Sequence, residues 1–173
     1  YYDRGRSYKV YFHIVGELTG ERERKEILPL IREHGLEPYV ILHGARHGLE
    51  LDELFEHADF GIGSPGRHPS GNTHIKTLKN REYAARGLAF AYSETDEDFD
   101  DKAYVMKIPA DETAVDIDGI VAFCRSLPMT GREIRDSIGN LSWKCQMQKV
   151  LCEVVPCTKT PALPVPPQNI RKI

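Results

Sequence analysis

The chain has 173 residues, of which 40% are hydrophobic and 28% are charged, and its formal net charge is −3. This size and composition fit one globular domain with a tail, and the slight excess of acidic residues argues against a nucleic-acid-binding protein. The sequence holds no run of about 18 apolar residues, so we expect no membrane-spanning segment. The four cysteines form no C-x-x-C pair, which predicts a reduced, cytoplasmic protein without a metal site or a disulfide framework.

The two ends of the chain differ from its middle. The opening residues, YYDRGRSYKV, contain neither an initiating Met nor a signal-peptide pattern, which suggests a fragment whose natural N-terminal part is missing. The last 18 residues hold five of the eleven prolines and cannot form a helix or an interior strand. We therefore expect one domain over residues 1–155 and a Pro-rich tail over 156–173.

Short apolar segments alternate with amphipathic ones along the chain. The predicted strands are residues 8–15, 39–44, 60–63, 88–92 and 104–109. The predicted helices lie within residues 16–35, with a kink or a break at Pro29, and at 51–58, 77–86, 116–127 and 130–155, the last with a joint at Gly139-Asn140. This alternation with short connections predicts an α/β fold with a single Rossmann-like, doubly wound parallel sheet and helices on both faces. In such sheets ligands bind outside the carboxyl ends of the strands.

Residues 71–92 read as a loop, a helix, a glycine stop and a strand. The run from Lys76 to Arg86 holds good helix formers, and Gly87 stands where a left-handed C-cap belongs. Between Arg67 and Arg86 there are five Lys or Arg and one acid, Glu82. Since a helix N-terminus presents unpaired N–H groups and a partial positive charge, this stretch predicts a phosphate-binding site.

An acidic run and a set of apolar residues with helical spacing stand in the second half of the chain. The acidic run SETDEDFDD, residues 93–101, is interpreted as a solvated loop, with a metal–carboxylate site as the alternative. Trp143, Met147 and Val150 have helical spacing, which predicts that they pack in the core.

Six segments in order carry a family resemblance: IVGE, RERKEILPLIREHGL, VILHG, LDELFEHADFGIGS, LKNREYAARGLAFAYS and LSWKCQMQKV. Together they resemble the C-terminal, nucleotide-sugar-binding half of GT-B retaining glycosyltransferases (glycosyl transferases group 1 type) over about residues 8–155. The resemblance implies a nucleoside-diphosphate-sugar donor, no obligatory metal and no other cofactor. It also implies an acceptor sugar or lipid-linked glycan held by an N-terminal domain, which leaves room for peripheral membrane contact through that domain. The fragment alone is expected to bind nucleotide weakly and to transfer little.

The resemblance also implies roles for single residues. Glu82 would accept hydrogen bonds from the ribose hydroxyls, and the helix start at Thr77 would face the diphosphate. His74 stands where the family has a glutamate near the donor sugar, and Ala89 stands where it has a proline. The candidate donor-binding residues are Gly16, Gly44, Leu51, Ser64, Arg67, Thr77, Leu78, Lys79 and Glu82, and His74 is the candidate catalytic residue.

Simpler interpretations stay open for several of these residues. Glu82 can be a surface carboxylate paired with Lys79 or Arg86, and His74 can be an ordinary loop histidine. Two alternatives to a transferase also stay open. One is a non-catalytic module that binds a nucleotide or a partner protein, and the other is a sugar-nucleotide epimerase of the same architecture.

Overall fold

The structure, a computed structural model, describes residues 1–6, 8–21 and 23–154. It has two compact units, the first formed by Tyr1–Arg135 and the second starting at Asp136. The strands are β1 (Phe12–Val15), β2 (Val40–Gly44), β3 (Phe60–Ile62), β4 (Ala89–Tyr92) and β5 (Val105–Lys107). The α-helices are α1 (Leu28–Glu33), α2 (Leu49–Glu56), α3 (Leu78–Arg86), α4 (Ile117–Ser126), α5 (Gly131–Asp136) and α6 (Trp143–Val154). Short 3-10 turns cover Tyr2–Arg4, His68–Ser70 and Gly139–Leu141, and a π-helical turn covers Glu23–Ile27.

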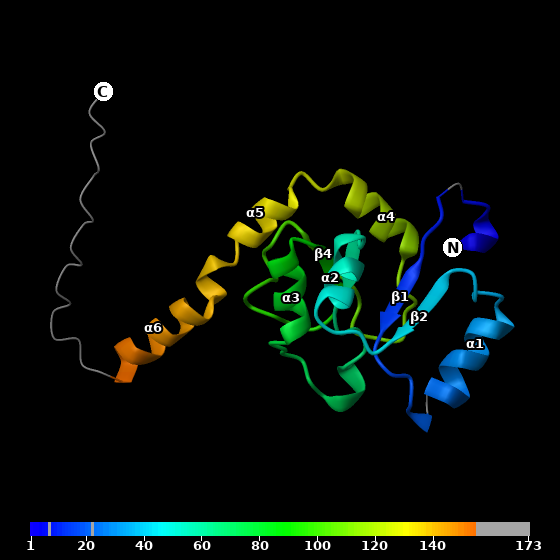
Figure 1. Cartoon of the computed structure of the whole chain (residues 1–173), viewed down its shortest axis with the longest axis horizontal. Helices are drawn as coiled ribbons and strands as arrows, with labels where there is room; N and C mark the ends of the chain where they lie inside the picture. Colours follow the sequence, from blue (N-terminus) through cyan, green and yellow to red (C-terminus); the bar gives the residue numbers. More distant parts are fainter. Residues whose placement is uncertain (7, 22, 155–173) are drawn as a thin grey trace. The chain divides into compact units, whose positions relative to one another are not determined.

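The predicted α/β class with parallel strands is confirmed, but the strands form two sheets where one was expected. β1 pairs with β2, and β4 lies between β3 and β5, with all pairs parallel. Helices flank both sheets, an arrangement compatible with a Rossmann-like fold (Figure 1). The difference arises because hydrophobic periodicity fixes where strands lie, but not which strand edges bond. A strand as short as β3, with three residues, offers few ladder positions.

The core of the first unit forms around β4 and α3. All four residues of β4 are buried because its sheet is covered on both faces. The ring of Phe90 in β4 packs among the rings of Tyr83 of α3, Phe99 and Tyr104. Gly61 allows α3 to approach β3 closely, since a Cβ there would lie 2.7 Å from the ring of Tyr83. Helices α2 and α3 lie side by side, and α1 lies beyond β1 and β2 from them (Figure 1).

Local signals placed the helix limits well. Thr77 is the N-cap of α3, its hydroxyl accepting a 3.4 Å hydrogen bond from the Asn80 N–H, and Gly87 ends the helix with φ of +79°. At Pro29, where a kink or a break is predicted, the chain stays helical. The π-helical turn passes directly into α1, whose first turn contains this proline.

The second unit contains the predicted joint near Gly139-Asn140, followed by α6. The core packing predicted for Trp143 is wrong, because 82% of this residue is exposed, and Met147 and Val150 are also exposed. Helical spacing predicts that these side chains share a face, but it does not supply a partner for that face. The predicted Pro-rich tail, 156–173, lies outside the described residues. Among the helices of the described part, none combines the length and apolar character needed to cross a bilayer.

Candidate functional site

The carboxyl ends of β3, β4 and β5 meet at one edge of the three-stranded sheet, because these neighbours run parallel. Helix α3 connects β3 to β4, so its N-terminus lies at the same edge. Two loops form this edge: residues 63–77 between β3 and α3, and residues 93–104 between β4 and β5. The loops are hydrogen-bonded to each other, since Ile75 N–H donates to Thr95 O at 2.8 Å and Thr95 N–H donates to Thr73 O at 2.9 Å.

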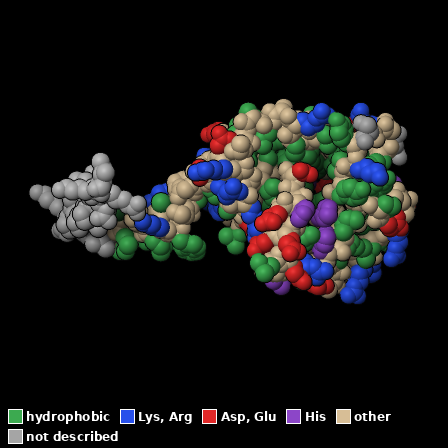
Figure 2. Space-filling model, turned by 45° about the horizontal axis from the view of Figure 1, so that its top comes forward, with side chains coloured by type: hydrophobic (Ala, Val, Ile, Leu, Met, Phe, Trp, Pro, Cys, Tyr) green, Lys and Arg blue, Asp and Glu red, His purple; other side chains and the backbone are tan. Residues whose placement is uncertain are grey.

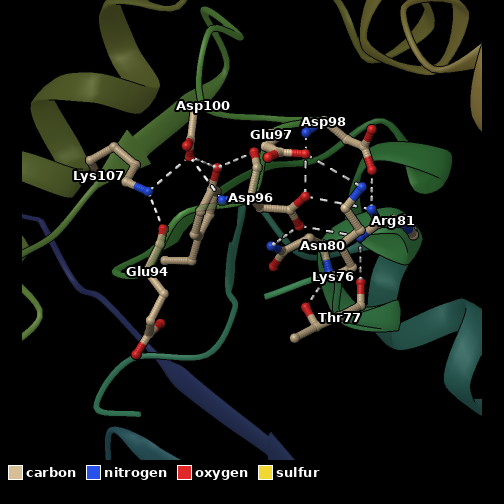
Figure 3. A network of polar contacts seen from close by, with 11 residues as sticks. Lys76, Thr77, Asn80, Arg81, Glu94, Asp96, Glu97, Asp98, Asp100 and Lys107 are labelled. Carbon is tan, nitrogen blue, oxygen red and sulfur yellow. Dashed lines mark hydrogen bonds and ion pairs between the residues drawn. The ribbon is translucent and has the colours of Figure 1, made fainter. Parts of the chain in front are cut away.

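The acidic run that follows β4 is folded against α3 and is not a solvated loop. Asp96 is fully buried, and its carboxylate accepts hydrogen bonds from Asn80 Nδ2 at 3.0 Å and Arg81 Nη1 at 3.2 Å (Figure 3). Arg81 also pairs with Asp98. The initial interpretation failed because the cation that neutralises these acids lies on the preceding helix. The alternative of a metal site gains no support, since no group of three or more metal-binding side chains is present within the described residues.

A second polar group closes the other side of the same loop. Tyr92 donates a hydrogen bond to Asp100, and Lys107 Nζ lies 2.9 Å from the same carboxylate. Burial, and then the bond to Asp100, raise the pKa of the Tyr92 phenol well above its ordinary value, so Tyr92 remains a donor. Burial alone would raise the pKa of Asp100, but the bonds from Tyr92 and Lys107 outweigh it and hold that pKa below its ordinary value. The sequence offered one overlooked sign of this folding, Phe99, which is fully buried inside the acidic run.

The predicted basic cradle is smaller than its five cations suggest. Arg81 is engaged with Asp96 and Asp98, and Arg86 pairs with Asp52 of α2 at 2.8 Å. Lys76 lies 3.7 Å from Glu97. This leaves the exposed side chains of Arg67 and Lys79, for which the described residues supply no hydrogen-bond or ion-pair partner. Two free cations at the edge therefore replace the predicted five.

The predicted diphosphate and ribose residues lie together on α3. Thr77 caps the helix, and Leu78 and Lys79 form its exposed first turn, with Leu78 83% exposed. Glu82 follows one turn later, is exposed, and pairs with Arg86 at 3.2 Å. This i,i+4 pair is the geometry of the simpler interpretation, but it leaves the Glu82 carboxylate accessible to a ligand.

His74 lies at the same edge of the sheet. It is exposed, its Nδ1 is 3.0 Å from Thr73 Oγ1, and its backbone bridges to Thr95. Together with Lys76, Thr95 and Glu97 it borders a shallow hollow. The side chain expected near the donor sugar is therefore open to solvent beside the start of α3.

Gly16 and Gly44 lie at the end of the two-stranded sheet. Gly16 N–H donates to Gly44 O at 2.8 Å, and both have positive φ, +134° and +67°, which favours glycine. Leu51 is half-buried on α2. Ser64, by contrast, is buried at the end of β3, where its carbonyl accepts a 3.3 Å bond from Ser93 Oγ. The candidate residues thus form two groups, and no hydrogen bond or ion pair within the described part joins Gly16 or Gly44 to the group around α3.

Histidine side chains gather on the face of the molecule shown in Figure 2. One pair of histidines, His13 of β1 and His43 of β2, joins the strands of the two-stranded sheet. His13 Nδ1 lies 2.9 Å from His43 Nε2, and the ring centroids are 5.1 Å apart with 15° between the planes. That separation is near the largest that this N···N contact allows, so the rings meet end to end, and an N–H of one ring donates a hydrogen bond to the nitrogen of the other. Burial, then His13 and Arg46, lower the pKa of His43.

This pair predicts a loss of stability in mild acid. Because the folded pKa of His43 is lowered, its contribution is complete above the ordinary value of 6.5 and declines as the pH falls through that value toward the folded pKa. We expect the urea midpoint to fall between about pH 7.5 and pH 5, and to fall less in His13→Asn. His57→Asn on α2 is the control. Parallel profiles for wild type and His13→Asn would contradict the prediction.

No protein-family model, curated protein or solved structure matches the chain. The function is therefore inferred from the chemistry of the edge formed by residues 63–82 and 93–97, and from the order of the sequence motifs. At that edge the chain offers a capped helix start, two free cations, an exposed carboxylate one turn along the helix, and an exposed histidine.

Proposed function

We propose that residues 8–155 form the donor-binding domain of a retaining glycosyltransferase and hold a nucleoside-diphosphate sugar. The observation that carries the proposal is that the loop with Arg67 and His74 and the start of α3 lie at the carboxyl edge of parallel strands, with Glu82 one turn further along α3. A diphosphate is bound by N–H donors and cations. The hydroxyls of the adjoining ribose are bound by a hydrogen-bond acceptor such as a carboxylate. The exposed surface of α3 presents these groups in that order.

The start of α3 supplies the diphosphate contacts in this proposal. The first N–H groups of a helix lack intrahelical partners, and the Thr77 hydroxyl satisfies that of Asn80. The N–H groups of Leu78 and Lys79 then face the ligand, with the charges of Lys79 and Arg67 beside them. When the bond from the anomeric carbon to the phosphate oxygen breaks, its electrons pass to that oxygen. Fixed N–H dipoles and cations stabilise the growing negative charge on the departing nucleoside diphosphate.

Glu82 binds the ribose in this proposal, since its two acceptor oxygens suit a vicinal diol. The ion pair with Arg86 supports this role, because it holds the carboxylate in one orientation on the exposed face of α3. The acceptor hydroxyl is positioned by a second domain, as the family resemblance implies.

His74 favours a second candidate function, a non-catalytic nucleotide-binding module. A glutamate at this position would accept hydrogen bonds from the donor sugar, whereas a neutral imidazole accepts only one. Such a module would bind the nucleotide through the same residues of α3, but the sugar of a nucleotide sugar would add little to the affinity. Comparing the affinity for a nucleotide sugar with that for its nucleoside diphosphate distinguishes the two candidates, since only a transferase donor site gains from the sugar.

The proposal predicts that Glu82→Ala weakens nucleotide binding. Losing hydrogen bonds to a charged acceptor corresponds to about tenfold or more in affinity. Calorimetry with UDP-, GDP- and ADP-sugars measures it, and Glu56→Ala, an exposed glutamate at the end of α2, is the matched control. The donor-site proposal fails if none of these ligands binds at about millimolar concentration, or if Glu82→Ala binds as tightly as wild type.

A further inference from the structure

Glu94 buries a carboxylate at the edge where the donor site is proposed. The residue is only 4% exposed, yet its side chain meets two neutral donors. Its Oε1 accepts from the backbone N–H of Arg67 at 2.7 Å, and its Oε2 accepts from Ser93 Oγ at 2.7 Å. No ion pair to this carboxylate occurs among the residues that the structure describes. Its charge is therefore balanced by N–H and O–H dipoles aimed at it.

The residues bonded to Glu94 bracket a tight turn. The chain leaves β3 through residues 63–66, where Gly66 has φ of +76°, and reaches Arg67. The carboxylate binds the N–H at the end of this turn, and Ser93 Oγ also lies 3.3 Å from Ser64 O at its start. Lys107 donates to the backbone carbonyl of Glu94, which holds the backbone of this residue from the side of β5. The side chain of Glu94 points away from that of Asp96 (Figure 3).

Three consecutive residues after β4 thus hold three successive parts of the β3–α3 connection. Glu94 binds the turn at 64–67 through its carboxylate. Thr95 binds residues 73 and 75 through its backbone. Asp96 binds Asn80 and Arg81 of α3. Each part carries a different candidate ligand group, so the three anchors are separable by mutation.

We propose that Glu94 is a positioning residue that fixes the turn at 64–67, and with it Arg67, against the start of α3, so that both face the diphosphate. This inference rests on the proposed donor site. A carboxylate holds an N–H more firmly than a neutral acceptor does. The bond engages only the backbone N–H of Arg67, so the guanidinium remains available to a ligand. The ribose contact proposed for Glu82 lies on α3 and does not involve this turn. Loss of the contact between Glu94 and the Arg67 N–H therefore lowers the affinity for the diphosphate and not the affinity for the nucleoside.

The test compares a nucleoside diphosphate with the nucleoside of the same base. Calorimetry with UDP, GDP and ADP first identifies the base that wild type binds, and the two ligands of that base are then titrated into Glu94→Gln. We expect about a tenfold loss of diphosphate affinity and less than about a twofold change for the nucleoside. Glu56→Gln, the same substitution at the far end of α2, is the control and keeps both affinities.

Each outcome decides between the two proposals. If wild type binds no nucleoside diphosphate, the proposed function fails and this inference fails with it. If wild type binds and Glu94→Gln loses nothing, or loses both ligands equally, only the positioning role is overturned. Should Glu94→Gln not fold, Ser93→Ala decides, because it keeps the carboxylate and removes one donor to it. A selective two- to threefold loss of diphosphate affinity, of the order of one weak neutral hydrogen bond, supports the role, and an equal or absent loss overturns it.

Discussion

Asp96→Ala is expected to lower the free energy of unfolding by about 3–5 kcal/mol, the cost of removing one partner from a buried ion pair. The carboxylate is fully buried and accepts hydrogen bonds from Asn80 Nδ2 and from both terminal nitrogens of Arg81. Its removal leaves the buried amide of Asn80 without its acceptor, and leaves Arg81 with Asp98 and the carbonyl of Thr77. Urea unfolding followed by circular dichroism measures the change.

Two further variants test the cause of that loss. Asp101→Ala removes an exposed carboxylate from the same acidic run and should change stability by less than about 0.5 kcal/mol. Combining Asp96→Ala with Arg81→Met should destabilise less than the sum of the two single variants, since each single variant already loses the interaction between Asp96 and Arg81. If Asp96→Ala costs no more than Asp101→Ala, the acidic run does not hold α3 in place.

Features set by nearby residues could be predicted from the sequence. The limits of α3 follow from Thr77 and Gly87, because a cap and a left-handed glycine act on their own turn. The parallel α/β class follows from the alternation of strands and helices. The division of the strands into two sheets does not follow, since strand neighbours depend on contacts between distant segments.

The candidate site shows the same limit. The position of His74, Thr77 and Glu82 at one edge could be predicted, because it follows from the direction of the strands and of α3. Which of the cations are engaged in ion pairs could not be predicted. Arg81 and Arg86 have the same charge as Lys79 in the sequence, but partners on the β4–β5 loop and on α2 engage both of them. Charge counting along the chain therefore overestimated the basic site and mistook a folded acidic loop for a solvated one.

Gly87→Ala is expected to cost about 3 kcal/mol, from two effects that add. Gly87 ends α3 in the left-handed region, with φ of +79°, where a Cβ costs about 1–2 kcal/mol. The same Cβ would also lie 2.4 Å from the backbone oxygen of Gly131 at the start of α5, and 2.6 Å from Arg135 Nη1. Relieving an overlap with backbone requires α5 to move, which costs about 1–3 kcal/mol more.

Gly71→Ala separates these two effects. Gly71 also ends a helical turn in the left-handed region, with φ of +72°, but its Cβ would meet nothing within 4 Å. This variant should therefore lose only the conformational part, about 1–2 kcal/mol, in the same urea titration. Moving α5 would also disturb the 3.1 Å bond from Arg135 Nη1 to Arg86 O at the end of α3, so Gly87→Ala should expose the last turn of α3 to faster amide exchange. Equal losses in the two variants would mean that the start of α5 shifts freely, and that the contact between Gly87 and Gly131 contributes nothing to stability.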